Sequence, residues 1–147
     1  MLSRTDFENV VRLTPLVSID LVIRNFRGDV LLGLRNNEPA SGFYFVPGGR
    51  IMKDERLDDA FRRVLYSETG LDLRFDSARF KGPYEHFYPT NFANQEGFGT
   101  HYVVLAYELT SPTSDLRPDG QHRELSWWRE DDARSSFKVH ENTRAYF

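Results

Sequence analysis

The chain contains no cysteine and only two methionines and two tryptophans in 147 residues. The lack of cysteine excludes disulfide scaffolds, thiolate metal sites and cysteine nucleophiles. Long apolar runs are also missing, and no stretch approaches the roughly 20 residues that a membrane span requires. The first six residues, Met1 to Asp6, become polar before an apolar stretch can build, unlike a secretory signal. We therefore expect a cytoplasmic protein with no membrane partner.

An excess of basic residues is absent as well. The chain has 19 Lys and Arg against 22 Asp and Glu, a net charge of -3, which argues against a nucleic-acid-binding surface. A mean hydropathy of -0.56 with 39% hydrophobic residues is typical of a globular chain that can bury one core. We expect a single domain over residues 1–147.

The apolar pattern predicts a hairpin near the start of the chain. Residues 16–23 alternate as a strand does, and Asp20 is an acid within this mostly apolar stretch. Turn residues 27–29 lead into a returning strand over 30–35, which ends at Arg35.

The strongest helix signal lies between Asp54 and Thr69, where apolar residues fall at spacings of three and four and form one stripe, closed by Gly70. Other patterns predict a helix capped by Thr5 and Glu8, a strand at 43–46, a tight turn at 47–49, extended structure at 71–84, a binding loop at 85–99, strands at 100–109 and 125–128, and a helix from Glu130. This order predicts a mixed α+β sheet sandwich flanked by helices.

One carboxylate stands out on the strongest helix. At about 100° per residue, Glu68 falls within the stripe made by Leu57, Phe61, Val64 and Leu65. An unpaired buried carboxylate costs several kcal/mol, so such a group is usually neutralised, paired with a cation or bound to a metal ion. The alternative is that Glu68, near the helix end, reaches solvent or pairs with an arginine.

The residues around this helix follow a recognisable spacing. In the order G-x5-E-x7-R-x4-E-x-G-L, they are Gly49, Glu55, Arg63, Glu68, Gly70 and Leu71. This spacing resembles the Nudix box, G-x5-E-x7-R-E-U-x-E-E-x-G-U, in which U is a bulky aliphatic residue. The resemblance implies a mixed α/β sandwich whose loop-helix-loop holds Mg²⁺ against a diphosphate.

The chain departs from the box at two acids, because Val64 and Ser67 stand in their places. One carboxylate and a backbone carbonyl can still hold one Mg²⁺, which keeps several water or phosphate ligands. The same loss is seen in the GDP-mannose mannosyl hydrolase branch of the Nudix superfamily, which cleaves the carbon–oxygen bond of the sugar. The chain is similar to that branch at residues 14–18, 45–50, 86–88, 100–105, 121–122 and 142–147.

This second resemblance implies a role for each matching residue. One Mg²⁺ per subunit would be held by Glu68, the carbonyl of Gly48 and the side chain of Gln121. The substrate would be GDP-mannose or GDP-glucose, released as GDP and hexose by a homodimer, with residues 85–99 or the N-terminal helix as candidate interface. The remaining roles are support of the departing GDP (Arg35), orientation of the diphosphate and metal (Arg50, Arg63), substrate contact (Asp20, Tyr102) and general base (His122).

These roles suit the residue types. A diphosphate is a good leaving group once Mg²⁺ and arginine neutralise its charge, so only the water needs activation. An imidazole, with an ordinary pKa of about 6.5, can take that proton. A single base with an in-line water predicts inversion at the anomeric carbon.

Each role has a plainer alternative. His122, Arg35 and Arg50 could be surface residues, Arg63 could pair with Asp59 or Glu55, and Asp20 could be a structural hydrogen-bond acceptor. The roles of His86, His101 and the aromatics Phe87, Tyr88 and Phe92 stay open, with packing as one alternative, and these residues stand outside the expected site. The whole chain could also be a conventional Nudix diphosphohydrolase that releases a nucleoside monophosphate, or a nucleotide-sugar sensor without turnover.

Overall fold

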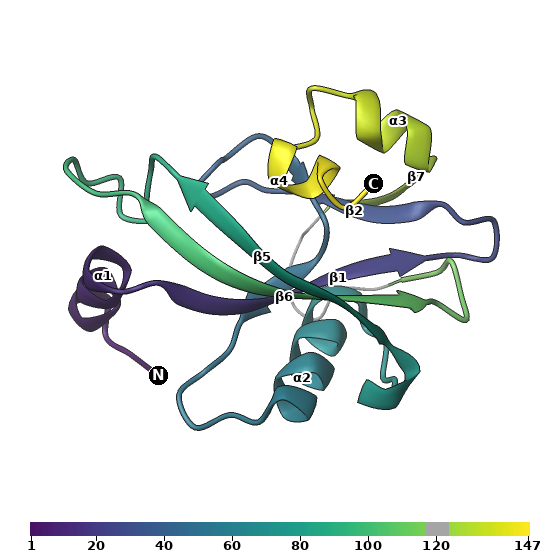
Figure 1. Ribbon diagram of the computed structural model, residues 1–147, viewed down its shortest axis with the longest axis horizontal. Helices are drawn as coiled ribbons and strands as arrows, with labels where there is room; N and C mark the ends of the chain where they lie inside the picture. The colour runs from purple at the N-terminus through teal and green to yellow at the C-terminus, as the bar shows by residue number, and fades with distance from the viewer. Residues whose placement is uncertain (117–123) are drawn as a thin grey trace.

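The computed structural model describes residues 1–116 and 124–147 (Figure 1). The helices are α1 (Arg4–Leu13), α2 (Leu57–Thr69), the 3₁₀ turn η1 (Phe75–Ser77), α3 (Glu130–Ser135) and α4 (Glu141–Arg144). The strands are β1 (Leu16–Arg24), β2 (Val30–Leu34), β3 (Tyr44–Phe45), β4 (Gly48–Arg50), β5 (Arg79–Tyr88), β6 (Thr100–Thr110) and β7 (Leu125–Trp128). Within these residues, no helix is both long and apolar enough to cross a bilayer.

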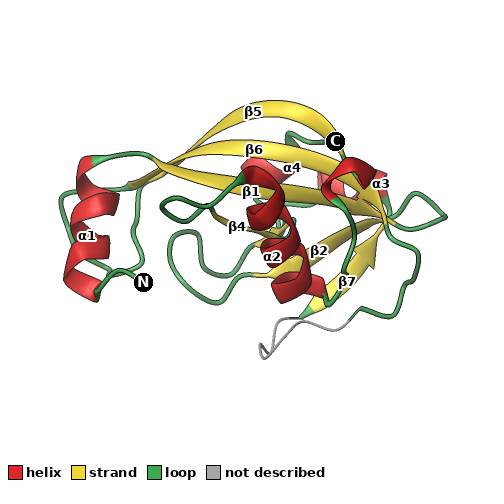
Figure 2. Cartoon of the chain, turned by 90° about the horizontal axis from the view of Figure 1, so that it is seen from below, coloured by secondary structure: helices red, strands yellow, loops and turns green. Residues whose placement is uncertain are grey.

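The described strands form one mixed sheet in the order β3-β2-β1-β6-β5, with β4 added to β1 and β7 added to β2. The pairing of β1 with β6 is parallel, and the other pairings within the sheet are antiparallel. Helix α2 lies on one face and helices α3 and α4 lie on the other (Figure 1), while α1 stands at one end of the sheet (Figure 2). The expected mixed sheet flanked by helices is confirmed.

Alternating side chains of β1 supply a separate core to each face. Ile19 and Leu21 are fully buried against α2 and Tyr107, whereas Val22 is buried with Val139 on the α3–α4 side. Because the period of a strand is two, one apolar strand can serve both layers. The strand is therefore buried on both faces, and Asp20 is a carboxylate in its middle.

Helix α2 confirms the stripe expected from its sequence, with one exception. Phe61 and Leu65 are fully buried and Glu68 is 5% exposed, but Leu57 is 42% exposed. Leu57 is the first residue of the helix, which begins three residues later than Asp54, so its side chain lies beyond the edge of the core. Gly70 ends the helix with φ 79°, as its position predicts.

The expectation of a tight turn at Pro47-Gly48-Gly49 is wrong. Gly48 to Arg50 form β4, and Gly48 pairs with Asp20 and Gly49 with Ile19 of β1. The expected close backbone approach is present, since a Cβ on Gly48 would lie 2.8 Å from the carbonyl oxygen of Ile19. The glycines thus allow a strand to lie where side chains would collide.

Other boundaries also differ. Ser3, not Thr5, caps α1, and its hydroxyl accepts from the backbone N–H of Asp6 at 3.2 Å. The expected 85–99 loop is shorter, because β5 runs through Tyr88, paired with β6. The 71–84 stretch contains η1 before β5 begins, and α4 had no clear signal in the sequence.

Two substitutions on α2 test which residues form the core. Phe61→Ala is expected to lower the free energy of unfolding by about 3–5 kcal/mol, because it removes a fully buried ring. Leu57→Ala, on the same helix but exposed, is expected to cost less than about 1 kcal/mol. Chemical denaturation measures both, and equal losses would contradict the placement of α2.

Candidate active site

Residues of six strands, β1 to β6, line a cavity of about 110 Å³. Asp20 comes from β1, Gly48 from β4, His86 from β5 and Tyr102 from β6. The parallel pairing of β1 with β6 and the pairings of β4 with β1 and of β5 with β6 bring these residues together. The cavity therefore gathers residues from chain segments that are far apart in sequence.

Asp20 is held by the far end of the chain. The Tyr146 hydroxyl donates to Oδ2 of Asp20 at 2.6 Å. Burial raises the pKa of Asp20 from its ordinary value of 3.8 to about 6, against the opposing effects of this hydrogen bond and of the nearby charge of Arg35. Asp20 is thus a hydrogen-bond acceptor and also lines the cavity.

Arg35 lies where the cavity meets the loop that follows β2. Its Cζ is 4.2 Å from the ring centroid of Phe45 and 6.0 Å from that of Tyr88. Its Nη1 donates to the carbonyl oxygen of Pro39 at 3.0 Å. The aromatic faces stabilise the cation without neutralising it, so its charge is available to an anion.

The other two arginines differ in their surroundings. Arg50 has its Cζ 4.5 Å from the ring centroid of Phe7 of α1. Arg63 donates twice to Glu55, at 2.7 and 2.9 Å, and once to the carbonyl oxygen of Arg50, at 2.8 Å. The Arg63 guanidinium lowers the pKa of Glu55. Arg63 therefore braces the β4–α2 connection, and the pairing with Glu55 that the sequence left open is present.

Strand β4 packs directly on α2 at a second glycine. A Cβ on Gly49 would lie 3.0 Å from Cγ2 of Val64. Glu68 follows Val64 by one helical turn and so lies on the same face of α2. Helix α2, which carries the buried Glu68, therefore packs on β4 through Gly49 and Val64.

The carbonyl of Gly48 and the carboxylate of Glu68 are the two expected ligands within the described residues, and their chemical type suits a single Mg²⁺. A backbone carbonyl and a carboxylate are hard oxygen ligands, and Mg²⁺ keeps its other positions for water or substrate phosphates. In residues 1–116 and 124–147, no group of three or more His, Cys, Asp or Glu is placed to share a metal ion. Gln121 and His122, the expected third ligand and general base, lie outside the described residues.

His86 and Tyr102 complete the polar lining. Burial lowers the pKa of His86 to about 4, assisted by the charges of His140 and Arg35. Its Nε2 is buried without a hydrogen-bond partner in the described part of the chain. Burial raises the pKa of Tyr102, so its hydroxyl keeps its proton. At neutral pH both groups are uncharged and can bond to a substrate.

Sequence reasoning gave no site role to two residues, His86 and Tyr146. The role of His86 was left open, and the structure places it in the lining of the cavity. Tyr146 was given no role, although it lies in the 142–147 segment that carries part of the family resemblance. Its contact with Asp20 joins residues that are 126 positions apart in the sequence, so only the folded structure reveals it.

The NUDIX domain family model matches residues 14–147 of the chain. The chain belongs to the Nudix family. The match covers the strands, the β4–α2 connection and the C-terminal segment, so the box read from the sequence is confirmed and the chain is a Nudix hydrolase.

Individual proteins agree with this assignment. The chain is 46% identical over 121 residues to the low-salt glycan biosynthesis protein Agl8 of Haloferax volcanii, covering 82% of this chain and 74% of that protein. A MutT NUDIX hydrolase from Burkholderia pseudomallei has a TM-score of 0.70 at 25% identity over 90% of this chain and 95% of its own. A MutT protein from Methanosarcina mazei has a TM-score of 0.72 at 21% identity over 90% of each chain and shares the fold.

The raised pKa of Asp20 predicts a pH-dependent stability. The Asp20 carboxyl group binds its proton more tightly in the folded state than in the unfolded state. Its contribution to the free energy of unfolding is therefore complete below about pH 4 and is lost as the pH rises through about 6. The free energy of unfolding of the wild type relative to Asp20→Asn is therefore expected to fall by about 2–3 kcal/mol between pH 4 and pH 7 without added metal.

Tyr146→Phe provides the matched comparison. This variant lacks the hydroxyl whose hydrogen bond lowers the pKa of Asp20 in the wild type. The free energy of unfolding is therefore expected to fall more with rising pH in this variant than in the wild type. Denaturant melts at several pH values measure both effects. A difference between wild type and Asp20→Asn that does not change with pH would contradict the burial of this carboxylate.

Proposed function

We propose that this Nudix hydrolase cleaves a GDP-sugar, GDP-mannose or GDP-glucose, to GDP and free hexose. Water attacks the anomeric carbon with inversion, and one Mg²⁺ per subunit assists. The observation that carries this proposal is the sparse set of acids on α2, where Glu68 is buried and Val64 and Ser67 stand in place of two acids of the box. A site with few carboxylates suits a reaction in which the metal neutralises a leaving diphosphate.

The proposed ligands of Mg²⁺ are Glu68, the carbonyl of Gly48 and the side chain of Gln121. When bound, Mg²⁺ supplies positive charge to the diphosphate. Arg35 supports the same group, and Arg50 is oriented by its contact with Phe7 and by the bond that its carbonyl accepts from Arg63. These cations stabilise the charge that develops on the departing diphosphate.

The sugar end belongs in the 110 Å³ cavity. Asp20, fixed by Tyr146, and the uncharged groups of His86 and Tyr102 can hydrogen bond to sugar hydroxyls there. His122 is proposed to take the proton from the attacking water. Removal of one proton by one base, without a covalent intermediate, is the pattern that inverts the anomeric carbon.

The name of one relative supports a carbohydrate substrate. The name of the Haloferax volcanii relative places that protein in glycan biosynthesis.

We also propose a cytoplasmic homodimer, as in the branch that the sequence resembles. The 85–99 segment and α1 touch each other within one chain, through rings of Phe7 and Phe92 whose centroids are 4.7 Å apart.

Hydrolysis of GDP-mannose in ¹⁸O-water tests which bond breaks. Because water attacks carbon, the label is expected in the hexose and not in GDP. Mass spectrometry of both products measures it. Label in a phosphate, together with a nucleoside monophosphate, would instead establish a conventional Nudix diphosphohydrolase, and tight binding without turnover would establish a sensor.

Two variants test the proposed roles of Glu68 and His122. Glu68→Gln is expected to raise the Mg²⁺ concentration for half-maximal activity by at least about tenfold, because it removes a charged ligand. His122→Gln is expected to lower kcat by about 10²–10⁴-fold with that concentration unchanged, because it removes only a base.

Glu96→Gln, an exposed acid, is the control for both variants. Steady-state rates over a Mg²⁺ titration separate the two effects. An unchanged Mg²⁺ response in Glu68→Gln would remove it from the metal site, and an unchanged rate in His122→Gln would remove it from the mechanism.

A further inference from the structure

The two carboxylate oxygens of Asp20 have different neighbours. Oδ2 accepts a hydrogen bond from the Tyr146 hydroxyl at 2.6 Å. Oδ1 lies against Gly48 of β4, since a Cβ at that glycine would collide with it. The torsion that turns a carboxylate has broad minima, so the side chain's own preferences do not fix which oxygen faces which neighbour. The bond from Tyr146 therefore sets the orientation of the Asp20 carboxylate.

Tyr146 is itself held firmly. Its side chain is buried, and its ring centroid lies 4.7 Å from that of Tyr84, edge-on, and 6.1 Å from that of His86. Its backbone N–H donates to the carbonyl oxygen of Thr143 at 3.0 Å. Burial and the neighbouring charge of Asp20 raise the pKa of Tyr146, so its hydroxyl keeps the proton that it donates. Ring packing and backbone bonding together fix the position of the donor.

The segment that carries Tyr146 is joined to the residues that lead into β4. The backbone N–H of His140 donates to the carbonyl oxygen of Tyr44 at 3.1 Å. The backbone N–H of Val46 donates to Oγ1 of Thr143 at 3.3 Å. Strand β4 begins two residues after Val46. The carboxylate therefore lies between two parts of one hydrogen-bonded unit.

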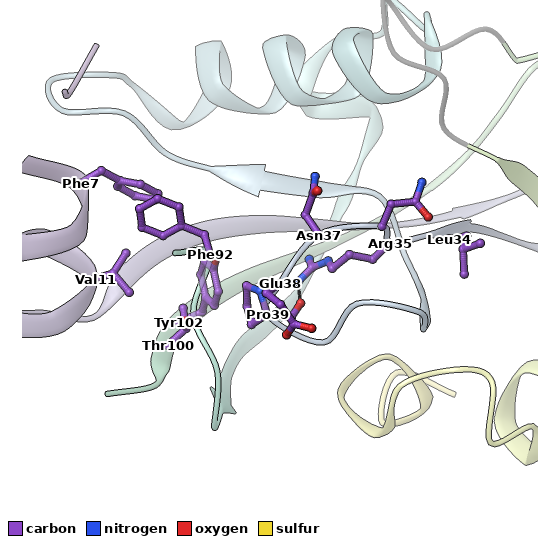
Figure 3. A pocket seen from close by; sticks show the side chains of 11 residues that line it. Phe7, Val11, Leu34, Arg35, Asn37, Glu38, Pro39, Phe92, Thr100 and Tyr102 are labelled. Carbon is purple, nitrogen blue, oxygen red and sulfur yellow. Dashed lines mark hydrogen bonds between the residues drawn. The ribbon is translucent and has the colours of Figure 1, made fainter. Parts of the chain in front are cut away.

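Tyr146 lies outside the lining of the site. Asp20 lines the 110 Å³ cavity together with Arg35 and Tyr102. The last two also line a larger hollow of about 410 Å³ beside α1, where Figure 3 shows both side chains. Tyr146 is not among the described residues that line either hollow. A ligand in the smaller cavity meets Asp20, and Tyr146 acts on that ligand through Asp20.

A core tyrosine also has a structural role, because its buried hydroxyl needs a hydrogen-bond partner. The ring of Tyr146 has such a role, since it packs in the core with Val22 and Val139. The choice of acceptor gives the hydroxyl a second role. Its partner is a carboxylate that lines the cavity, and a hydrogen bond to an ionised acceptor is shorter and stronger than one between neutral groups.

We propose that Tyr146 is a positioning residue, which orients the Asp20 carboxylate so that Oδ1 is the oxygen offered to a sugar hydroxyl. This step rests on the proposed function, which places the sugar beside Asp20. With Oδ2 bound to Tyr146, the substrate meets an acceptor that is already oriented, and no carboxylate rotation is frozen on binding. Without the hydroxyl, the carboxylate can turn, and the sugar is held less precisely for attack at its anomeric carbon.

Tyr146→Phe removes the hydroxyl and keeps the ring. This variant is expected to lower kcat/KM for GDP-mannose by at least about tenfold, because the sugar is held less precisely. Its affinity for GDP, which has no sugar, is expected to stay within about twofold of that of the wild type. Steady-state rates and calorimetric titration, both with Mg²⁺, measure the two quantities. Equal losses in kcat/KM and in GDP affinity would overturn the positioning role.

Tyr84→Phe is the matched control. Tyr84 touches the Tyr146 ring and lies outside the described lining of both hollows, so this variant is expected to match the wild type in both measurements. A double-mutant cycle tests the route of the effect. In an Asp20→Ala background, Tyr146→Phe is expected to change kcat/KM by less than about twofold, because the group that it orients is gone. An undiminished loss in that background would show that Tyr146 does not act through Asp20.

The orientation of Asp20 is also measured without a substrate. Crystal structures are expected to show one carboxylate orientation in the wild type and a turned or divided one in Tyr146→Phe. A single, unchanged orientation in the variant overturns the proposal. GDP-mannose turnover by the wild type is followed separately. If the wild type does not hydrolyse GDP-mannose while the variant loses the Asp20 orientation, the positioning role is supported and the proposed function fails.

Discussion

The pairing of β4 with β1 is the constraint on which the rest of the site depends. Gly48 lies opposite Asp20 at a separation that leaves no room for a Cβ, and a Cβ on Gly49 would lie 3.0 Å from Cγ2 of Val64 on α2. These two contacts join the sheet to the helix that carries Glu68. A side chain at Gly48 would push β4 away from β1, and one at Gly49 would require Val64 of α2 to shift.

The positive charges around this junction are supported in different ways. Arg35 and Arg50 lie against aromatic rings, which stabilise a cation without cancelling its charge, whereas Arg63 is engaged by a carboxylate and a carbonyl. The first two are therefore suited to an anionic ligand, and the third holds the loop that presents one of them. The net charge of -3 averages over this local arrangement and does not reveal it.

Local patterns were sufficient to predict much of the fold. The strand at β1, the apolar stripe of α2 apart from Leu57, and the stop at Gly70 each depend on neighbouring residues, and each is confirmed. The pairing of Gly48 with Asp20 was not predicted, because a glycine pair is compatible with either a turn or an edge strand and only tertiary packing decides between them.

The positions of several candidate residues could be predicted, while their roles stay predictions. The helix stripe predicted that Glu68 is buried, and the family resemblance pointed to Asp20, Arg35 and Tyr102, which line one cavity. Tyr146 could not be deduced from a periodic pattern, because its role depends on a contact between the C-terminal segment and β1.

Cleavage at carbon is the central claim, and the configuration of the released sugar tests it most directly. GDP-mannose is incubated with the protein and Mg²⁺, and NMR follows the hexose anomers before they equilibrate. The account predicts that the first hexose released has the anomeric configuration opposite to that of the substrate, together with GDP. A hexose released with retained configuration, or a sugar phosphate released with GMP, would contradict it.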